Sequence, residues 1–336
     1  MFSGIQPTGV PHLGNYLGAL RNWVALQDEH EAFYCIVDLH ALTAPWDPKT
    51  LERQTLEAGA SVMACGVDPQ RSVLFVQSHV AAHSELAWIL NCLARMGELR
   101  RMIQFKEKSR GETESVGVGL FTYPVLQAAD VLAYRAHGVP VGEDQRQHIE
   151  LMRDIGARFN AAFGDTFVLP EAWIPPSGAR IMALDDPTQK MSKSAGRPAA
   201  SILLSDPPEA VARKVRSAVT DSGREVAASA DKPALTNLLT IYSLVAGAPL
   251  GELERRFAAA GYGDFKKALS EELNAFLDPV RDRLRQFLDD PGETAALLRR
   301  GGERAAETAE AVMTQVRERT GLLPGPDRRA SLGAAR

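Results

Sequence analysis

Two short segments, far apart in the chain, carry residue types that can bind a polyphosphate. Residues 190–194 (K-M-S-K-S) place two ammonium groups and two hydroxyls within five positions, and residues 185–187 (D-D-P) interrupt regular structure before them. Lysines neutralise phosphate charge as point charges. We therefore expect residues 190–194, called the lysine loop below, to bind phosphate. A solvated basic loop is the alternative, because two lysines at this spacing are by themselves a weak signal.

The second segment, residues 11–15 (P-H-L-G-N), lies at the predicted start of a helix. Residues 2–5 predict a buried strand and residues 6–9 (Q-P-T-G) a turn, after which apolar residues recur at helical spacing. The first N–H groups of a helix have no partner within it, and its dipole favours negative charge, so this is a potential anion site. Gly14 would let a nucleotide approach the backbone. A plain turn capped by His12 is the alternative.

Strands and helices are predicted to alternate through the first half of the chain. Residues 32–37 and 72–77 are apolar runs of strand length, as in parallel strands covered on both faces. A helix is expected to begin at Asp47-Pro48 and end at Gly66, and another to span residues 84–96. This alternation predicts an α/β fold with a Rossmann-type parallel sheet. Residues 38–40 (D-L-H) follow a strand at the sheet edge where such folds bind ligands.

A polar pair stands in the apolar stretch of residues 123–130 (Y-P-V-L-Q-A-A-D). A helix with Pro124 in its first turn would place Gln127 and Asp130 on one face. Apolar residues follow Asp130, so its carboxylate is expected to be partly buried and to need a partner. An internal ion pair or a helix cap is the structural alternative, although no Lys or Arg lies within a turn of Asp130 on this helix before Arg135. A substrate indole N–H, a pure donor, is the other candidate partner, and such a pocket rejects analogues lacking the donor by roughly 10⁴–10⁵.

Several segments resemble the class I aminoacyl-tRNA synthetases. Residues 12–15 (H-L-G-N) are similar to their HIGH signature, and residues 190–194 match their KMSKS loop letter for letter. Residues 4–9 (G-I-Q-P-T-G), 141–145 (V-G-E-D-Q) and 178–182 (G-A-R-I-M) resemble bacterial tryptophanyl-tRNA synthetases. The likeness extends from Phe2 to about Gly321.

The resemblance has two departures. Asn15 replaces the second histidine of the signature and keeps hydrogen-bond donors while losing the titratable ring. Gln127 occupies a position where the bacterial tryptophanyl enzymes often carry Met. In addition, tyrosyl-tRNA synthetases bind the phenol of tyrosine with residues in the same pattern, Y-x-x-x-Q-x-x-D. Local chemistry therefore leaves tyrosine open. Residues 139–145 (V-P-V-G-E-D-Q) favour tryptophan, because tyrosyl-tRNA synthetases have a different sequence, G-G-x-D-Q, in this segment.

The resemblance implies a tryptophan–tRNA ligase. Such an enzyme activates L-tryptophan with ATP, supplied as MgATP, to tryptophanyl-adenylate and pyrophosphate, then transfers the tryptophanyl group to tRNA(Trp) and releases AMP. It implies a cytoplasmic homodimer with no membrane association, no metal site of its own and no permanently bound cofactor. A tyrosyl-tRNA synthetase is the alternative, as is a retired paralogue that senses an amino acid or binds a partner; the intact lysine loop argues against the latter.

The resemblance also implies the roles of individual residues. Those expected to act in catalysis are His12, Asn15, Lys108, Lys190 and Lys193. Those expected to bind ATP are Gln6, Pro7, Thr8, Gly14, Asn15, Gly142, Glu143, Asp144, Ile181, Lys190, Met191, Ser192, Lys193 and Ser194. Those expected to bind tryptophan are Phe2, His40, Tyr123, Gln127, Asp130, Val141 and Gln145.

At 336 residues the chain is expected to hold two domains. Residues 1–195 are predicted to form the Rossmann-type catalytic domain, with a lid or insertion at about 97–119. Residues 196–324 read as amphipathic helices, which the resemblance identifies as the tRNA anticodon-binding domain; a dimer-supporting or structural bundle is the alternative. Residues 325–336 are predicted to be a disordered tail.

Composition limits the remaining possibilities. A net charge of −4 gives no general attraction for nucleic acid. Three cysteines without a C-x-x-C pair favour a reducing compartment and no zinc site. The N-terminus does not read as a signal peptide, and no apolar run approaches the ~20 residues that span a bilayer.

Overall fold

The structure is a computed structural model that describes residues 1–102, 117–174, 180–193 and 197–323. Its centre is a parallel sheet in the order β1-β2-β3, formed by β1 (Phe2–Ile5), β2 (Phe33–Ile36) and β3 (Val73–Val76). Phe2 pairs with Phe33 and Phe33 with Val73, so the three strands end at one edge. All residues of β2 and β3 are buried, which explains their uninterrupted apolar sequence. The predicted strands are confirmed to within one residue at each end.

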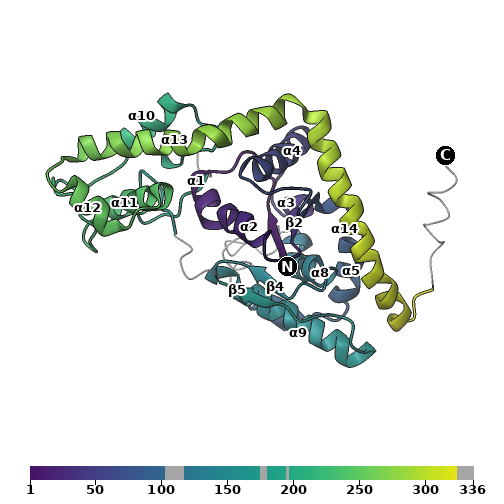
Figure 1. The fold of residues 1–336 in the computed structure, drawn as a ribbon. Helices are drawn as coiled ribbons and strands as arrows, with labels where there is room; N and C mark the ends of the chain where they lie inside the picture. The colour runs from purple at the N-terminus through teal and green to yellow at the C-terminus, as the bar shows by residue number, and fades with distance from the viewer. Residues whose placement is uncertain (103–116, 175–179, 194–196, 324–336) are drawn as a thin grey trace.

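A second, two-stranded parallel sheet lies beside the first. It consists of β4 (Gly138–Pro140) and β5 (Glu171–Trp173), and β4 contacts β1. At Gly138 an added Cβ would lie 1.9 Å from the ring of Trp173, so only glycine lets that ring lie across the strand. In Figure 1 the pair lies in the lower part of the molecule, just above α9.

The helices of the first half cover both faces of the central sheet. After β1 come α1 (Leu13–Asn15), a π-helical turn, η1 (Tyr16–Leu20), and α2 (Arg21–Leu26). After β2 come α3 (Asp38–Ala41) and α4 (Pro48–Ala64), and Asp47 caps α4 by accepting from the Lys49 backbone N–H at 3.0 Å, as predicted. The remaining elements of this half are η2 (Gln77–His79), α5 (Ala82–Asn91), α6 (Met96–Arg100), α8 (Val118–Leu132), η3 (Glu143–Gln145) and α9 (Arg146–Phe163).

Two of the helix boundaries predicted here were wrong. The single helix expected at residues 84–96 is divided into α5 and α6. Pro124, expected in a first turn, lies inside α8, because that helix begins at Val118. Proline lacks the N–H that an interior helical position donates, so the sequence predicted that the helix starts close to Pro124. Packing against α5 and α9 instead stabilises a longer helix with this proline inside it.

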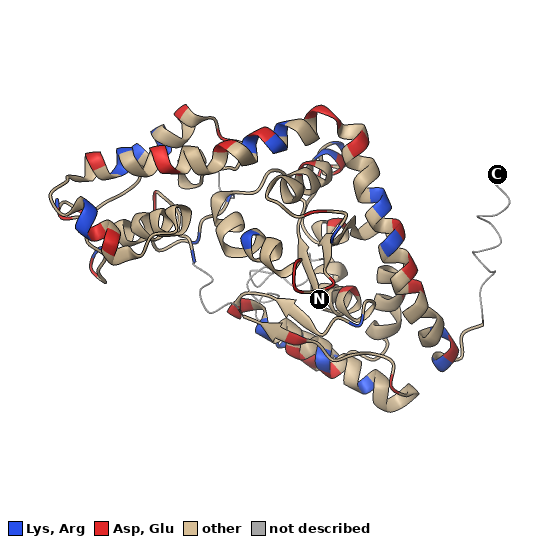
Figure 2. Cartoon of the chain, in the orientation of Figure 1, with Lys and Arg blue, Asp and Glu red and all other residues tan. Residues whose placement is uncertain are grey.

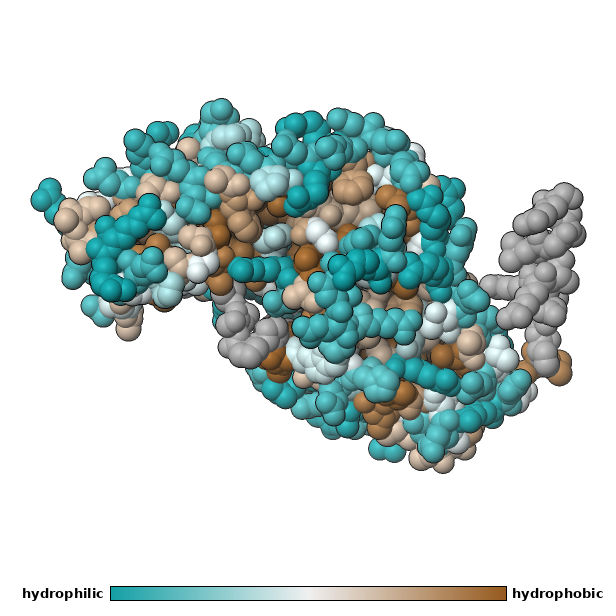
Figure 3. Space-filling model, in the orientation of Figure 1, coloured by the Kyte–Doolittle hydropathy of each residue, from teal (hydrophilic) through white to brown (hydrophobic). Residues whose placement is uncertain are grey.

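The second half is helical, as predicted. A helical arm, residues 208–289, comprises α10 (Pro208–Ser217), α11 (Pro233–Ala246), α12 (Leu250–Phe257) and α13 (Tyr262–Asp289), and a short turn, η4 (Pro198–Ala200), precedes it. α13 runs the length of the arm and also packs on α4 (Figure 1). Hydrophilic side chains cover most of the face over α13 and α14, and apolar ones show nearer the centre (Figure 3).

The last helix, α14 (Pro291–Thr320), returns to the sheet. The pair Gly301-Gly302 is unfavourable inside a helix, yet α14 continues through it: Asp290 caps the helix and Pro291 begins it. A Cβ on Gly301 would lie 1.8 Å from the Leu74 carbonyl oxygen, so this glycine permits a close crossing of helix and strand. Apolar residues of α14 from Ala305 to Val316 share a core with the sheet. Although it lies within residues 196–324, α14 therefore packs on the α/β unit.

Of the helices that the structure describes, none alone is long and apolar enough to span a bilayer. α11 and α12 meet that test only as a pair, and they are bent by 110° at the break between them.

Candidate active site

A cavity of about 1020 Å³ opens at the carboxyl-terminal edge of the central sheet and extends beneath the lysine loop. It brings together segments that lie up to 190 positions apart in the chain. Most of the residues predicted from sequence line it: Phe2, Gln6, His12, Gly14, Asn15, His40, Tyr123, Gln127, Asp130, Val141, Gly142, Glu143, Asp144, Gln145, Ile181, Lys190, Met191 and Ser192. The two polar segments and the Asp130 helix therefore face one space.

Some predicted site residues lie elsewhere. Pro7, Thr8 and Lys193 are beside the cavity but not part of its wall. Lys108 and Ser194 lie outside the described residues, as does most of the lid expected at 97–119.

His12 and Asn15 form a reciprocal cap at the start of α1. The His12 ring accepts from the Asn15 backbone N–H through Nδ1 at 3.2 Å, and Asn15 Oδ1 accepts from the His12 backbone N–H at 3.1 Å. An accepting Nδ1 carries no proton, so the neutral ring has its hydrogen on Nε2. The Nε2–H of His12 and the amide hydrogens of Asn15 are the donors that the cap leaves for a ligand. Gly14 makes room for this ring, since its Cβ would lie 3.0 Å from Nδ1.

The lysine loop strengthens the electropositive character of this end. Burial, followed by the charges of Lys193 and Lys190, lowers the pKa of His12 to about 4, so the ring is neutral at pH 7. A neutral donor beside two cations suits an anion that carries its own negative charge.

Lys193 is held against the turn that follows β1. Its Nζ donates to the carbonyl oxygens of Thr8 and Val10, both at 2.7 Å. Burial lowers its pKa to about 8, an effect that the Glu57 carboxylate opposes. The lysine loop therefore meets the first turn in this structure, but through a backbone contact at the cavity margin.

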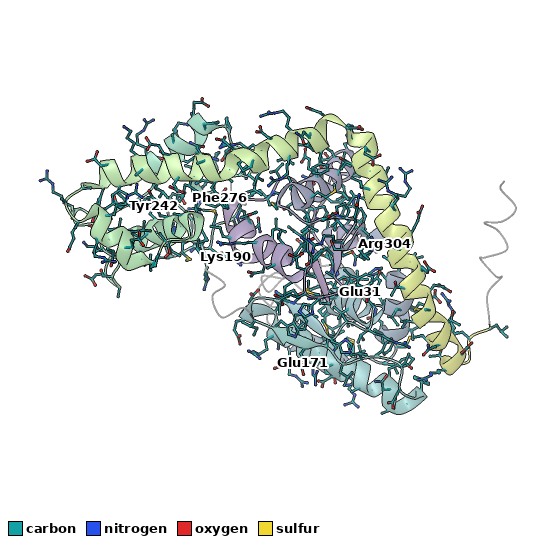
Figure 4. The ribbon with its side chains drawn as sticks, viewed as in Figure 1. Glu31, Glu171, Lys190, Tyr242, Phe276 and Arg304 are labelled. Atoms are coloured by element: carbon teal, nitrogen blue, oxygen red, sulfur yellow. The ribbon has the colours of Figure 1, made fainter. Side chains whose placement is uncertain are left out.

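The lysine loop is also joined to the helical arm. Lys190 forms an isolated antiparallel bridge with Met182, and the Met191 N–H donates to the Ile181 carbonyl oxygen at 2.9 Å. Asn237 of α11 exchanges two hydrogen bonds with the Met182 backbone, at 2.9 and 3.0 Å. Lys190 accordingly lies between the arm and the sheet in Figure 4. A movement of the arm would thus be transmitted to the loop.

Asp130 forms the opposite, buried end of the cavity, and its partners come from other elements. Its side chain is 2% exposed. Oδ2 accepts from His40 Nε2 at 2.8 Å, and Oδ1 accepts from His83 Nδ1 at 2.6 Å and from Gln77 Nε2 at 2.7 Å. Burial alone would raise the pKa of Asp130, but the charges and hydrogen bonds of His40 and His83 outweigh it and hold the pKa below its usual range.

The sequence argument for a substrate partner was therefore incomplete. It considered Lys and Arg near Asp130 in the chain, whereas the structure supplies His40 from α3, Gln77 from η2 and His83 from α5. Asp130 nevertheless lines the cavity, so internal bonding and access to a ligand occur together. Gln77 and His83 were missed. The one available signal was their position: Gln77 ends the apolar strand run at 72–77 and His83 follows it, toward the same sheet edge as His40. Arg180 also lines the cavity and was not singled out.

The pKa of His12 predicts a pH dependence of stability. The unfolded chain takes up a proton near the ordinary value of 6.5, whereas folded His12 does so near 4. Its contribution to the free energy of unfolding is therefore complete above pH 6.5 and is lost as pH falls toward 4. Between pH 7 and pH 5, the free energy of unfolding measured with urea should therefore fall less for His12→Gln than for wild type. An NMR titration of the His12 ring with a midpoint near 6.5 would contradict this.

Comparison with known proteins identifies the family. The family model described as tRNA synthetases class I (W and Y) matches residues 1–278. Over 327 residues the chain is 52% identical to tryptophan–tRNA ligase 2 of Streptomyces avermitilis, covering 96% of this chain and 97% of that protein.

Two solved structures are similar throughout. Tryptophanyl-tRNA synthetase from Mycoplasma pneumoniae superposes with a TM-score of 0.86 at 35% identity, covering 96% of this chain and 97% of that one. The Campylobacter jejuni enzyme, complexed with ADP and tryptophan, superposes with a TM-score of 0.83 at 35% identity, covering 96% and 99%. The fold, the two signature segments and these matches agree, and the chain belongs to the class I tRNA synthetases (W and Y).

Proposed function

We propose that this chain is a tryptophan–tRNA ligase that binds ATP at the His12 end of the cavity and tryptophan at the Asp130 end. The observation that carries the proposal is that one cavity joins hydrogen-bond donors suited to phosphate, together with Lys190, to the buried acceptor Asp130. The ADP and tryptophan named for the Campylobacter jejuni relative are ligands of the same two kinds. Relatives named tryptophan–tRNA ligase match 96% of this chain at 51–52% identity, which favours tryptophan over tyrosine as the substrate.

The first step forms the adenylate. The tryptophan carboxylate oxygen attacks the α-phosphorus of ATP, and the bond to the bridging oxygen breaks, so that pyrophosphate leaves with its electron pair. His12 Nε2–H, the Asn15 amide and Lys190 line the space for the phosphates. Their role is to position the reactants and to stabilise the charge that develops on the leaving group. Mg²⁺ enters on the nucleotide phosphates as part of the substrate.

The second step consumes the adenylate. A ribose hydroxyl at the 3′ end of tRNA(Trp) attacks the tryptophanyl carbonyl carbon, AMP leaves, and the tryptophanyl ester is formed. Residues 1–195 would carry this chemistry, with Lys108 supporting the phosphates as the resemblance implies. The anticodon would meet residues 196–324, chiefly the helical arm. Lys, Arg, Asp and Glu are interspersed along α13 (Figure 2), so shape and individual contacts would contribute more than a continuous basic surface. We expect a ligase with these substrates to act in the cytoplasm.

Exchange of pyrophosphate into ATP tests the proposal directly. The purified chain should catalyse ATP–pyrophosphate exchange with L-tryptophan in preference to L-tyrosine. Exchange with L-phenylalanine, whose ring has no donor, should be weaker by roughly 10⁴-fold or more, as for a site built around a buried hydrogen bond. Exchange with tyrosine alone would replace this proposal with a tyrosyl enzyme. Exchange with neither amino acid would indicate a retired synthetase.

Lys193 should act in the transition state. Because its Nζ now donates to two backbone carbonyl oxygens, ATP has to draw it from the cavity margin to the phosphates, as closure of the two domains would do. Lys193→Ala should lower kcat for exchange by about 10²-fold or more while changing the KM for tryptophan little. Lys266, whose Nζ similarly donates to the Ala218 carbonyl oxygen at 2.7 Å in the arm, provides the control, and Lys266→Ala should leave kcat unchanged. An equal change in kcat and KM for Lys193→Ala would argue against this role.

A homodimer would cover an apolar surface on α5, α6 and α8. Trp88, Met96 and Val118 are 72%, 58% and 75% exposed, although α5 and α6 both pack on α8. Large apolar side chains grouped in this way are typical of protein interfaces.

Trp88→Lys should therefore convert the dimer to monomers, because a charge would be buried at the interface. Light scattering after size exclusion measures this, and Trp46→Lys, at a tryptophan 52% exposed in the loop before α4, is the matched control. A monomeric wild-type chain, or a dimeric Trp88→Lys variant, would contradict this interface.

A further inference from the structure

The two oxygens of Asp130 have different surroundings. Oδ1 accepts from both Gln77 and His83. Within the part of the chain that the structure describes, Oδ2 accepts from His40 alone. A carboxylate oxygen has two lone pairs, so Oδ1 is fully used and Oδ2 retains one acceptor position. A ligand donor that reaches Asp130 would therefore bind Oδ2.

His83 fixes this asymmetry, and Tyr134 fixes His83. The His83 ring is fully buried, and its Nδ1 donates to Asp130 because an ionised carboxylate can only accept. Its Nε2 lies 2.8 Å from the Tyr134 hydroxyl, which donates to it when the ring is neutral. Tyr134 in turn stacks on Phe2 and Phe33, with ring centroids 5.6 and 4.6 Å apart. Neither ring can turn without breaking these contacts.

Gln77 is oriented by a separate contact. Its Oε1 accepts from the Leu39 N–H at 3.1 Å, which leaves Nε2 directed at Asp130 Oδ1. Two donors from different elements thus hold one carboxylate oxygen and set the plane of the whole group. Asp130 lines the cavity, and Oδ2 is the oxygen of this carboxylate that retains acceptor capacity for a ligand there.

We propose that His83, held by Tyr134, is a positioning residue that presents Asp130 Oδ2 to a ring N–H and so determines the preference for tryptophan over aromatic amino acids without that donor. The inference rests on the proposed function. His83 acts through Asp130 and does not itself line the cavity.

The test compares tryptophan with benzothienylalanine, in which sulfur replaces the indole N–H. His83→Leu should raise the KM for tryptophan in pyrophosphate exchange by about 10- to 100-fold, as expected for a lost hydrogen bond to a charged group, while the KM for ATP changes less than about twofold. The KM for benzothienylalanine should stay the same, because that analogue has no N–H to place. His83→Asn, whose amide N–H lies near the position of Nδ1, should recover most of the affinity.

Tyr134→Phe supplies a second, milder variant, since it keeps the ring stacking and removes only the hydroxyl. Tyr134→Phe should raise the KM for tryptophan, by a smaller factor than His83→Leu, and leave the KM for benzothienylalanine unchanged. If His83→Leu does not fold, this variant tests the positioning role of His83. Equal KM increases for tryptophan and the analogue, or no increase for tryptophan, would overturn the role of His83 while leaving the ligase activity intact. A wild-type chain that activates no amino acid would instead refute the proposed function.

Discussion

The buried carboxylate of Asp130 constrains the structure more than any other group. An ionised side chain with 2% exposure is stable only when its charge is matched by donors. Those donors come from the ends of two strands and from α5, so α3, η2, α5 and α8 have to converge at one place. Removing one partner of a buried charge typically costs about 3–5 kcal/mol, which ties the stability of the fold to the geometry of the site.

The other end of the cavity depends on a different device. His12 is an unusual helix cap that uses its ring nitrogen where Ser, Thr, Asp or Asn would use an oxygen. The cap fixes the tautomer and leaves donors for an anion, while burial, aided by the charges of the two lysines, lowers the pKa of the ring and keeps it neutral. One end of the cavity is therefore built to accept a hydrogen bond, and the other to donate to negative charge.

The helical arm and α14 connect this site to the rest of the molecule in different ways. Asn237 links the arm to the backbone beside the lysine loop. The ring centroids of Tyr16 and Phe276 lie 5.3 Å apart, edge to face, and Figure 4 labels Phe276 on α13. α14 supports the sheet from outside, where Arg304 donates to the carbonyl oxygens of Pro69 and Ser72. The arm can thus influence the loop, whereas α14 stabilises the floor of the site.

The sequence alone determined the local elements and their chemical types. Apolar runs located the three strands of the central sheet, the pair Asp47-Pro48 located a helix cap, and periodicity showed that the second half is helical. Letter patterns located residues 12–15 and 190–194. All these signals lie within a few neighbouring positions. Only the tertiary structure decided which groups meet. Gln77 and His83 join Asp130 across about 50 positions, Lys193 reaches the Thr8 carbonyl oxygen across 185, and Gly301 continues a helix because β3 lies against it. Such contacts depend on how the sheet edge and helices pack in space, and no local pattern records that arrangement.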